Sequence, residues 1–275
     1  MKVEILLPII ERPHCVNLVL KNLEKAVKPE DCQILAAVSS SDKYFSFIEK
    51  RLREIFKSAR VFKISDNWIE HHEIRPDLDS GTKWSKSNIN QEKMKGVNKT
   101  YSFLQKTASR DVDYYWIMED DNLFPLDTFT RYIHLMEGLK ADIITGVSYS
   151  WYQAPKVTNF WTLKRKRVFG EQDTCKETTL KVDYFEPVDE GVVRLGACGL
   201  VNVLMKKEVL LSWQPERIPE LGSAADISFF VNAQKNNYKA YGIWNIRLPH
   251  ITKIDEDTYQ IMGKIDKSIM ELINV

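Results

Sequence analysis

Three adjacent acidic residues follow directly on a short apolar run near the middle of the sequence. The run, residues 114–118, is rich in aromatic side chains and predicts a buried strand. The acids that follow it are Glu119, Asp120 and Asp121. Neighbouring carboxylates repel one another and are unfavourable to bury without a counter-charge, which a divalent cation can supply. Oxygen ligands favour Mg²⁺ or Mn²⁺ over zinc.

The expected position of these acids also bears on function. Ligands of open α/β sheets bind beyond the carboxyl ends of the strands, where these acids would lie. The motif therefore indicates a metal-dependent enzyme that acts on a phosphorylated ligand. The alternative interpretation is a solvated acidic turn before Pro125.

Composition restricts the class of protein. The chain has 275 residues, of which 44% are hydrophobic and 28% charged, as in a soluble globular protein with a substantial core. The formal net charge of +1 gives no overall attraction to nucleic acid or to an acidic membrane surface. The four cysteines form no CxxC pair, so their spacing predicts no zinc site. No apolar run approaches the roughly 20 residues of a membrane span, and none at the N-terminus suits a signal peptide. We therefore expect a cytoplasmic protein without a transmembrane segment.

The first part of the chain alternates between strand-like and helix-like patterns. Apolar runs at 3–7, 34–38 and 61–64 predict strands, the first of them ended by Pro8. Amphipathic patterns at 14–26 and from Asp42 to about Ala59 predict helices between them. This alternation is typical of a mostly parallel central sheet with helices on both faces, so the predicted fold class is α/β.

The later elements are less regular. We expect a polar loop at 66–88, helices at 90–106 and 126–139, and a strand at 142–149. Residues 150–190 form a long aromatic and basic segment that includes the run 164–167. Further on we expect a short helix near 206–213, a helix at 226–236 and a strand at 239–246. In the tail, 255–275, isoleucines and a leucine near one stripe predict an amphipathic C-terminal helix.

Several short motifs occur in a particular order along the chain. The strand before Pro8 is followed by Arg12-Pro13, and Ser40-Ser41-Asp42 follows the second strand. After the acids come Gly196-Ala197-Cys198-Gly199, then Asp226 and His250. In this order the motifs resemble those of GT-A fold glycosyltransferases, family 2 in particular. The resemblance covers about residues 1–252, whereas Ala225 stands where the family usually has a glutamate.

The resemblance implies an architecture and an activity. The fold would be a Rossmann-like GT-A domain over 1–252, with a nucleotide-binding half at 1–122 and an acceptor-binding half at 123–252, followed by a helical tail at 253–275. The activity would be transfer of a sugar from a nucleotide-sugar donor, most simply UDP-linked, to an acceptor hydroxyl with inversion. Mn²⁺ or Mg²⁺ would assist. A retaining reaction stays open.

The resemblance also assigns roles to particular residues. Asp121 and His250 would bind the metal ion, and Asp226 would be the general base. The nucleotide-sugar would contact Pro8, Glu11, Arg12, Asp42, Lys95, Asp120 and Gly196. Simpler interpretations compete with several of these roles. Asp42 and Asp226 could be helix N-caps, His250 a surface histidine, and Lys95 part of a solvated helix face.

Two alternative functions stay open at this point. A sugar-phosphate nucleotidyltransferase would share the nucleotide-binding half, although residues 8–12 lack the glycines that such enzymes carry after the first strand. A catalytically inactive nucleotide-sugar-binding module would share the whole scaffold. The acceptor, whether glycan, lipid, protein or modified nucleic acid, is not determined by these motifs, and neither is a homo-oligomeric state. The basic run 164–167 would suit a polyanionic acceptor, or it is a solvated face.

Overall fold

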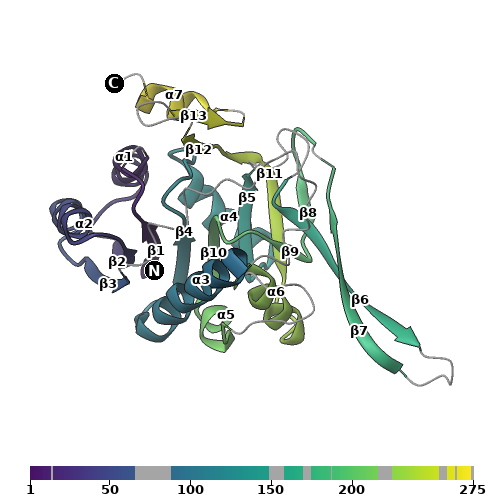
Figure 1. Cartoon of the computed structure of the whole chain (residues 1–275). Helices are drawn as coiled ribbons and strands as arrows, with labels where there is room; N and C mark the ends of the chain where they lie inside the picture. Colours follow the sequence, from purple (N-terminus) through teal and green to yellow (C-terminus); the bar gives the residue numbers. More distant parts are fainter. Residues whose placement is uncertain are drawn as a thin grey trace.

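The computed structural model describes residues 1–13, 15–65, 88–148, 158–169, 175–186, 188–215, 225–253, 259–263 and 265–273. An eight-stranded sheet with the strand order β3-β2-β1-β4-β10-β5-β11-β8 forms its centre (Figure 1). The first half of the chain contributes β1 (Val3–Ile10), α1 (Val16–Ala26), β2 (Cys32–Ser39), α2 (Asp42–Ile55), β3 (Arg60–Ser65), α3 (Asn88–Thr107) and β4 (Tyr114–Met118). No helix in these described ranges is long and apolar enough to cross a membrane.

The second half completes the sheet and adds two hairpins. Its helices are α4 (Thr128–Leu139), α5 (Lys207–Ser212), α6 (Ala225–Lys235) and α7 (Lys267–Ile273). Its strands are β5 (Ile143–Ser148), β6 (Phe160–Phe169), β7 (Cys175–Tyr184), β8 (Val192–Arg194), β9 (Ala197–Cys198), β10 (Asn202–Lys206), β11 (Ala240–Leu248), β12 (His250–Lys253) and β13 (Tyr259–Met262).

The direction of the strands confirms the predicted mostly parallel α/β sheet. Strands β1, β2, β3 and β4 pair in parallel, and β5 pairs in parallel with β11. Among the described strands of this central sheet, only β10 and β8 run against their neighbours. From β1 the chain moves outward through β2 to β3 and then returns to place β4 on the other side of β1. The sheet therefore has its topological switch point between β1 and β4, the place where ligands of such sheets bind.

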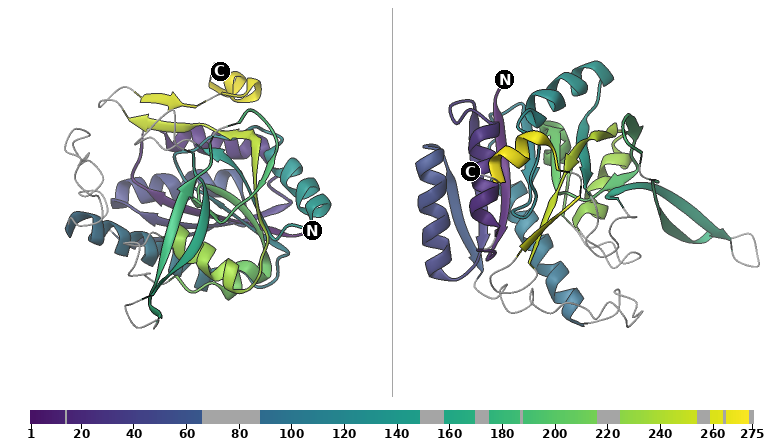
Figure 2. Two further views of the ribbon diagram at one scale, coloured as in Figure 1. Left: turned by 90° about the vertical axis from the view of Figure 1, so that its right-hand side faces the viewer. Right: turned by 90° about the horizontal axis from the view of Figure 1, so that it is seen from above.

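Both faces of the sheet are covered by helices (Figure 2). Residues alternate along a strand, so β4 sends Trp116 to one core and Tyr115 to the other. Helices α1, α2 and α4 pack on the side of Trp116, and α3, α5 and α6 pack on the side of Tyr115. The predicted helices on both faces are confirmed.

The first strand does not end at Pro8 as the sequence pattern predicted. It continues to Ile10, with Pro8 in register with Ala37 of β2. The last pair between β1 and β4 is Leu6 with Ile117, and the amide of Ile10 points to the β4 side, where it bonds Asp120. Residues two apart along a strand direct their amide nitrogens to the same side, so the nitrogen of Pro8 also faces the β4 side. The ladder between β1 and β4 has already ended there, so the missing N–H of Pro8 leaves no ladder bond unmade.

A long hairpin occupies much of the segment 150–190, for which the sequence predicted no regular structure. Strands β6 and β7 pair from Trp161 with Tyr184 out to Phe169 with Cys175. The hairpin projects from the body of the molecule (Figures 1 and 2). The basic residues 164–167 lie on β6.

The C-terminal segment is not one helix over 255–275. Strand β13 at Tyr259–Met262 pairs with β12, and only Lys267–Ile273 is helical as α7. The predicted apolar stripe nevertheless packs together. Ile269 lies in a small third core with Ile251 of β12 and Leu123, and Ile261 and Ile265 pack against it. Backbone pairing with β12 therefore makes Tyr259–Met262 a strand rather than a helix, and the isoleucines of the predicted stripe still pack against one another.

Candidate active site

The acids lie where β1 and β4 end side by side. The amide of Ile10, at the end of β1, donates a hydrogen bond of 2.8 Å to Oδ2 of Asp120. The thiol of Cys15 lies 3.3 Å from the backbone oxygen of Asp120, and the amide of Glu119 donates to the carbonyl of Val201 at 2.9 Å. Asp120 and Asp121 are each 5% exposed. The solvated acidic turn is therefore excluded for these two residues.

Strand β12 brings His250 to the same place. The amide of Ile251 donates to the backbone oxygen of Asp121 at 2.7 Å, and the amide of Leu123 donates to the carbonyl of Pro249 at 2.9 Å. Between these bonds Asn122 and His250 form an isolated antiparallel bridge. The result is that Nε2 of His250 lies 3.1 Å from Oδ2 of Asp121. His250 is thus not an isolated surface histidine.

The guanidinium of Arg12 neutralises the two aspartates. Its Nη1 donates to Oδ1 of Asp120 at 2.9 Å and also bonds Oδ2 of Asp121. The second oxygen of Asp121, Oδ1, accepts a hydrogen bond of 2.7 Å from Nδ2 of Asn122. The sequence analysis placed Arg12 near the nucleotide, and nothing in a sequence reveals that its side chain reaches both acids.

Burial and neighbouring charges separate the three carboxyl groups in acidity. Burial, with the adjacent charge of Asp121, raises the pKa of Glu119 to about 7. Burial raises the pKa of Asp120 to about 6 despite the opposing effect of Arg12. Burial acts in the same direction on Asp121, but Arg12 and His250 outweigh it and hold the pKa of Asp121 well below its usual range. Asp121 is therefore the most acidic of the three carboxyl groups and stays fully ionised at neutral pH.

The Asp121–His250 pair fits the ligand set of a divalent ion. Cis ligands of an octahedral ion with bonds of about 2.1 Å are about 3 Å apart, which matches the 3.1 Å between Oδ2 and Nε2. An imidazole ligand favours a transition ion such as Mn²⁺ over Mg²⁺. In the described ranges no group of three or more His, Cys, Asp or Glu side chains is arranged to hold a metal. The protein would thus supply one or two ligands and leave the other positions to phosphate and water.

Asp226 lies in the first turn of α6 and is partly buried. Its Oδ1 accepts a hydrogen bond of 2.8 Å from the amide of Ile227, which fits a local helix-start role. Burial raises the pKa of Asp226 to about 6. This value suits a group that accepts a proton near neutral pH.

Tyr101 of α3 lies beside the acidic motif, and the charge of Asp226 also acts on it. Its hydroxyl lies 3.5 Å from Oε1 of Glu119, and its side chain is buried. Burial raises the pKa of Tyr101 well above its ordinary value, and the negative charges of Glu119 and Asp226 raise it further. The sequence analysis did not single out Tyr101, because a tyrosine in an amphipathic helix is most often part of the core.

Two of the residues predicted to contact the nucleotide-sugar, Glu11 and Asp42, follow the ends of β1 and β2. The carboxylate of Glu11 accepts hydrogen bonds from the amide and the hydroxyl of Ser41, at 2.8 and 3.1 Å, and thereby joins the turns after β1 and β2. Ser41 is the N-cap of α2, whereas Asp42 has a 94% exposed side chain that pairs with Lys63. The N-cap interpretation of Asp42 is therefore wrong, and its carboxylate faces solvent.

Two further predicted contacts, Lys95 and Gly196, receive no support from the described residues. Lys95 belongs to α3, but its side chain lies outside the described part of the structure. The amide of Gly196 donates to the carbonyl of Trp161 at 2.9 Å, and the carbonyl of Gly196 accepts from Gln234 at 3.3 Å. Because both backbone groups of Gly196 are bonded within the protein, this geometry gives its predicted donor contact no support.

Comparisons with known proteins identify the fold. No protein-family model and no curated protein sequence matches this chain. Among solved structures, S. aureus TarS 1-349 matches with a TM-score of 0.52 and 13% identity, over 90% of this chain and 60% of TarS 1-349. TarS 1-349 in complex with UDP-GlcNAc matches with a TM-score of 0.50 and 15% identity, over 98% of this chain and 61% of the other.

A third match is GalNAc-T7 with UDP, GalNAc and Mn²⁺, with a TM-score of 0.58 and 7% identity, over 93% of this chain and 44% of GalNAc-T7. This chain thus spans less than two thirds of the TarS and GalNAc-T7 chains it resembles. At these identities the likeness establishes the fold, and the predicted GT-A fold is confirmed.

Proposed function

We propose, from the GT-A fold of this chain and from the acid–histidine pair at its switch point, that it is a metal-dependent glycosyltransferase. It transfers a sugar from a nucleotide-sugar donor, UDP-linked, to an acceptor hydroxyl. The observation that carries the proposal is the 3.1 Å approach of His250 Nε2 to Asp121 Oδ2 at the carboxyl edge of β1 and β4. That edge is where an open α/β sheet binds its ligand.

The donor would lie across the ends of β1, β2 and β4. The exposed carboxylate of Asp42 is available to accept a hydrogen bond from the base, with Lys63 displaced. Asp120 is held by Ile10 and Arg12 beside the path of the ribose and diphosphate. These groups bind and orient the donor and perform no bond-breaking step.

Asp121 and His250 would hold the ion, because Asp121 stays ionised and Nε2 lies at ligand distance from it. When bound, Mn²⁺ or Mg²⁺ neutralises the charge that develops on the diphosphate leaving group. The protein prepares this site by burying the acids and by fixing the ligands through the backbone bonds of β12 to residues 121–123.

Asp226 is proposed as the general base. Its carboxylate would take the proton from the acceptor hydroxyl as the oxygen attacks the anomeric carbon, which inverts the configuration in one displacement. With a pKa of about 6, Asp226 is mostly ionised at neutral pH and still basic enough for the transfer. The proposal is supported by the charge of Asp226, which acts on Tyr101, whose hydroxyl lies 3.5 Å from Oε1 of Glu119 in the acidic motif.

The direct test is binding and turnover of a donor. Titration calorimetry with UDP should give binding that requires Mn²⁺ and is lost with a chelator, and UDP-GlcNAc should be hydrolysed slowly under the same conditions. Asp121→Asn should abolish the Mn²⁺-dependent binding of UDP. Asp127 is an exposed carboxylate at the start of α4, and Asp127→Asn should leave this binding unchanged. If Asp121→Asn binds UDP with the same Mn²⁺ requirement as the wild type, Asp121 is not a metal ligand. Binding without any hydrolysis would favour an inactive binding module.

A further inference from the structure

Arg12 supplies the positive charge that balances the two aspartates of the acidic motif. Both of its bonds to the carboxylates, to Asp120 and to Asp121, come from the single nitrogen Nη1. In the described part of the chain, Nε and Nη2 have no hydrogen-bond partner. The guanidinium therefore uses one nitrogen of a fork that can make two parallel bonds to a carboxylate or a phosphate.

The backbone of Arg12 is fixed while its side chain is accessible. The amide of Arg12 donates to the hydroxyl of Tyr44 at 3.2 Å, and its carbonyl accepts from the amides of Cys15 and Val16 at 3.2 and 3.1 Å. The side chain of Arg12 is 26% exposed, compared with 6% for Asp120 and 8% for Asp121. Arg12 is thus the most exposed member of the ion cluster, and its side chain can rotate while its backbone stays fixed.

A divalent ion and Arg12 compete for the same oxygen. Oδ2 of Asp121 is shared between Arg12 and His250, and Oδ1 is taken by Asn122. An ion held by Asp121 and His250 needs lone pairs of Oδ2 and adds two positive charges beside the guanidinium. Of the described groups bonded to Asp120 and Asp121, Arg12 is the only cation on a long and partly exposed side chain.

We propose that Arg12 is a resident counter-ion that leaves the two aspartates when metal and donor bind, and that its guanidinium then pairs with the donor diphosphate. This inference rests on the proposed function, because it requires a diphosphate to receive the arginine. In the donor-free protein Arg12 keeps the acids neutralised. In the loaded protein the ion takes over that role, and the planar fork of Arg12 becomes available for two phosphate oxygens.

The test is to measure two affinities that should change in opposite directions. In Arg12→Gln, calorimetry should show Mn²⁺ alone binding about tenfold more tightly than to the wild type, because the competing cation is gone. UDP with saturating Mn²⁺ should bind about tenfold more weakly, because a charge-assisted bond to phosphate is lost. A purely structural role of Arg12 would weaken both.

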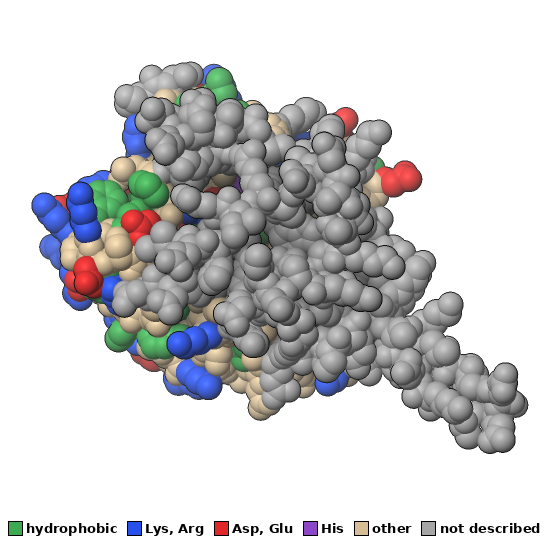
Figure 3. All heavy atoms as spheres, viewed as in Figure 1, with side chains coloured by type: hydrophobic (Ala, Val, Ile, Leu, Met, Phe, Trp, Pro, Cys, Tyr) green, Lys and Arg blue, Asp and Glu red, His purple; other side chains and the backbone are tan. Residues whose placement is uncertain are grey.

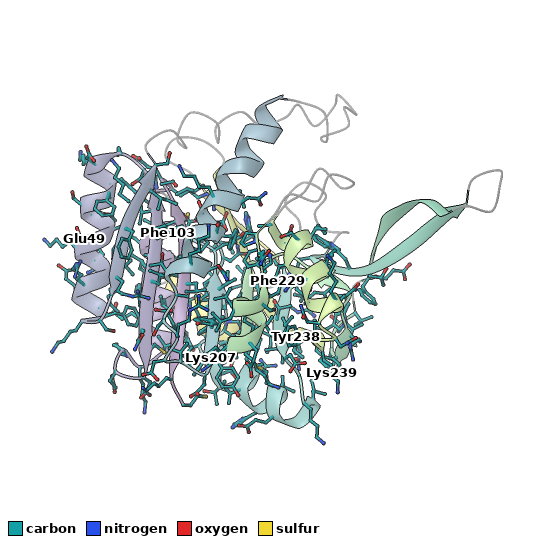
Figure 4. The ribbon with its side chains drawn as sticks, turned by 90° about the horizontal axis from the view of Figure 1, so that it is seen from below. Glu49, Phe103, Lys207, Phe229, Tyr238 and Lys239 are labelled. Atoms are coloured by element: carbon teal, nitrogen blue, oxygen red, sulfur yellow. The ribbon has the colours of Figure 1, made fainter. Side chains whose placement is uncertain are left out.

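The matched control is Arg53→Gln. Arg53 pairs with Glu49 at 2.9 Å on the outer side of α2, where Figure 4 labels Glu49 pointing away from the sheet. Basic and acidic side chains are interspersed over this edge of the molecule in Figure 3. Removing a charge there should change neither affinity.

A second variant keeps the test decisive if Arg12→Gln does not fold. Arg12→Lys retains the charge and loses the fork, so it should bind Mn²⁺ within about threefold of the wild type and UDP about tenfold more weakly. Unchanged UDP affinity in Arg12→Lys, or unchanged or weaker Mn²⁺ binding in Arg12→Gln, overturns the inference. A wild type that binds Mn²⁺ but no UDP refutes the proposed function instead, and the Mn²⁺ comparison still reports on Arg12.

Discussion

Nε2 of His250 lies 3.1 Å from Oδ2 of Asp121, and the backbones of the two segments are bonded on both sides of this contact. The pair depends on the chain beyond the central sheet. Ile251 of β12 and Leu123 of the acidic loop share a small core with Ile269 of α7. Helix α7 is tied to α1 through Lys21 Nζ and the carbonyl of Leu272 at 3.3 Å. The C-terminal segment therefore holds the candidate metal ligands in position.

This support can be tested with Ile269→Ala. Truncating a fully buried isoleucine should lower the free energy of unfolding by about 2–4 kcal/mol through lost burial and the cavity that remains. Because Ile269 packs beneath β12, Mn²⁺ affinity should also fall. Chemical denaturation and Mn²⁺ titration measure the two effects.

The matched control for Ile269→Ala is Ile48→Ala. Ile48 is equally buried but lies in the core on the side of Trp116. Ile48→Ala should lower the free energy of unfolding by a similar amount and leave the Mn²⁺ affinity at its wild-type value. Equal Mn²⁺ affinity in both variants would show that the small C-terminal core does not position His250.

Asp226→Asn should separate binding from chemistry. The amide is nearly isosteric and keeps an oxygen for the bond from Ile227, so the start of α6 should persist. Donor affinity should stay within about threefold, while turnover should fall by about 10² or more because the proton acceptor is gone. Steady-state rates of donor turnover, beside calorimetry with UDP, give the comparison. A nearly normal rate would remove Asp226 from the reaction.

The stability of the metal-free protein should decrease as the pH rises. Glu119, Asp120 and Asp226 have folded-state pKa values of about 7, 6 and 6, above their unfolded values, so the folded protein binds more protons between about pH 4 and pH 7. The free energy of unfolding should therefore fall through this window. The raised pKa of His250 acts with the same sign, since its stabilisation is lost on deprotonation. Asp121 acts oppositely, and its contribution is lost only as the pH falls below about 4.

Glu119→Gln isolates the largest of these contributions. This variant should make the decrease in stability with pH less steep and raise the free energy of unfolding at pH 7.5 by on the order of 2 kcal/mol, because no partly buried carboxylate has to ionise there. Denaturant titrations at several pH values, with exposed Glu24→Gln as the control, measure the slope. If the free energy of unfolding of Glu119→Gln falls with pH as steeply as that of the wild type, burial does not raise the pKa of Glu119.

Two glycines offer a pair of opposite predictions. A Cβ at Gly146 of β5 would lie 2.5 Å from the backbone oxygen of Ile246, so Gly146→Ala should destabilise the protein by about 2–3 kcal/mol. A Cβ at Gly138 of α4 would meet nothing within 4 Å, so Gly138→Ala should stabilise it by about 0.5 kcal/mol through helix propensity. Thermal unfolding should show a lower melting temperature for Gly146→Ala and a higher one for Gly138→Ala than for the wild type. Equal melting temperatures of the two variants would refute the steric argument.

The sequence pattern located the elements that depend on local information. Apolar runs and amphipathic spacing predicted the strands and helices of the first half, because burial on one face produces a period in the chain itself. The strand before Glu119 was predicted with its observed bounds, 114–118. The β6–β7 hairpin was missed, because its strands mix basic and apolar residues and depend on pairing with each other. The pattern of the tail predicts a single helix, because the period of its isoleucines does not reveal that Tyr259–Met262 pairs with β12.

The sequence by itself determined that acids follow a buried strand, that a strand and a helix at the start of the chain precede them, and that an α/β sheet results. Only the tertiary structure decided which charges meet. The contacts of Asp121 with Arg12 and with His250 join residues that are remote along the chain, and they exist because β1, β4 and β12 converge at one edge of the sheet. Local residue preferences carry no information about such contacts, since the free energy that forms them comes from packing the whole sheet and its two covering layers.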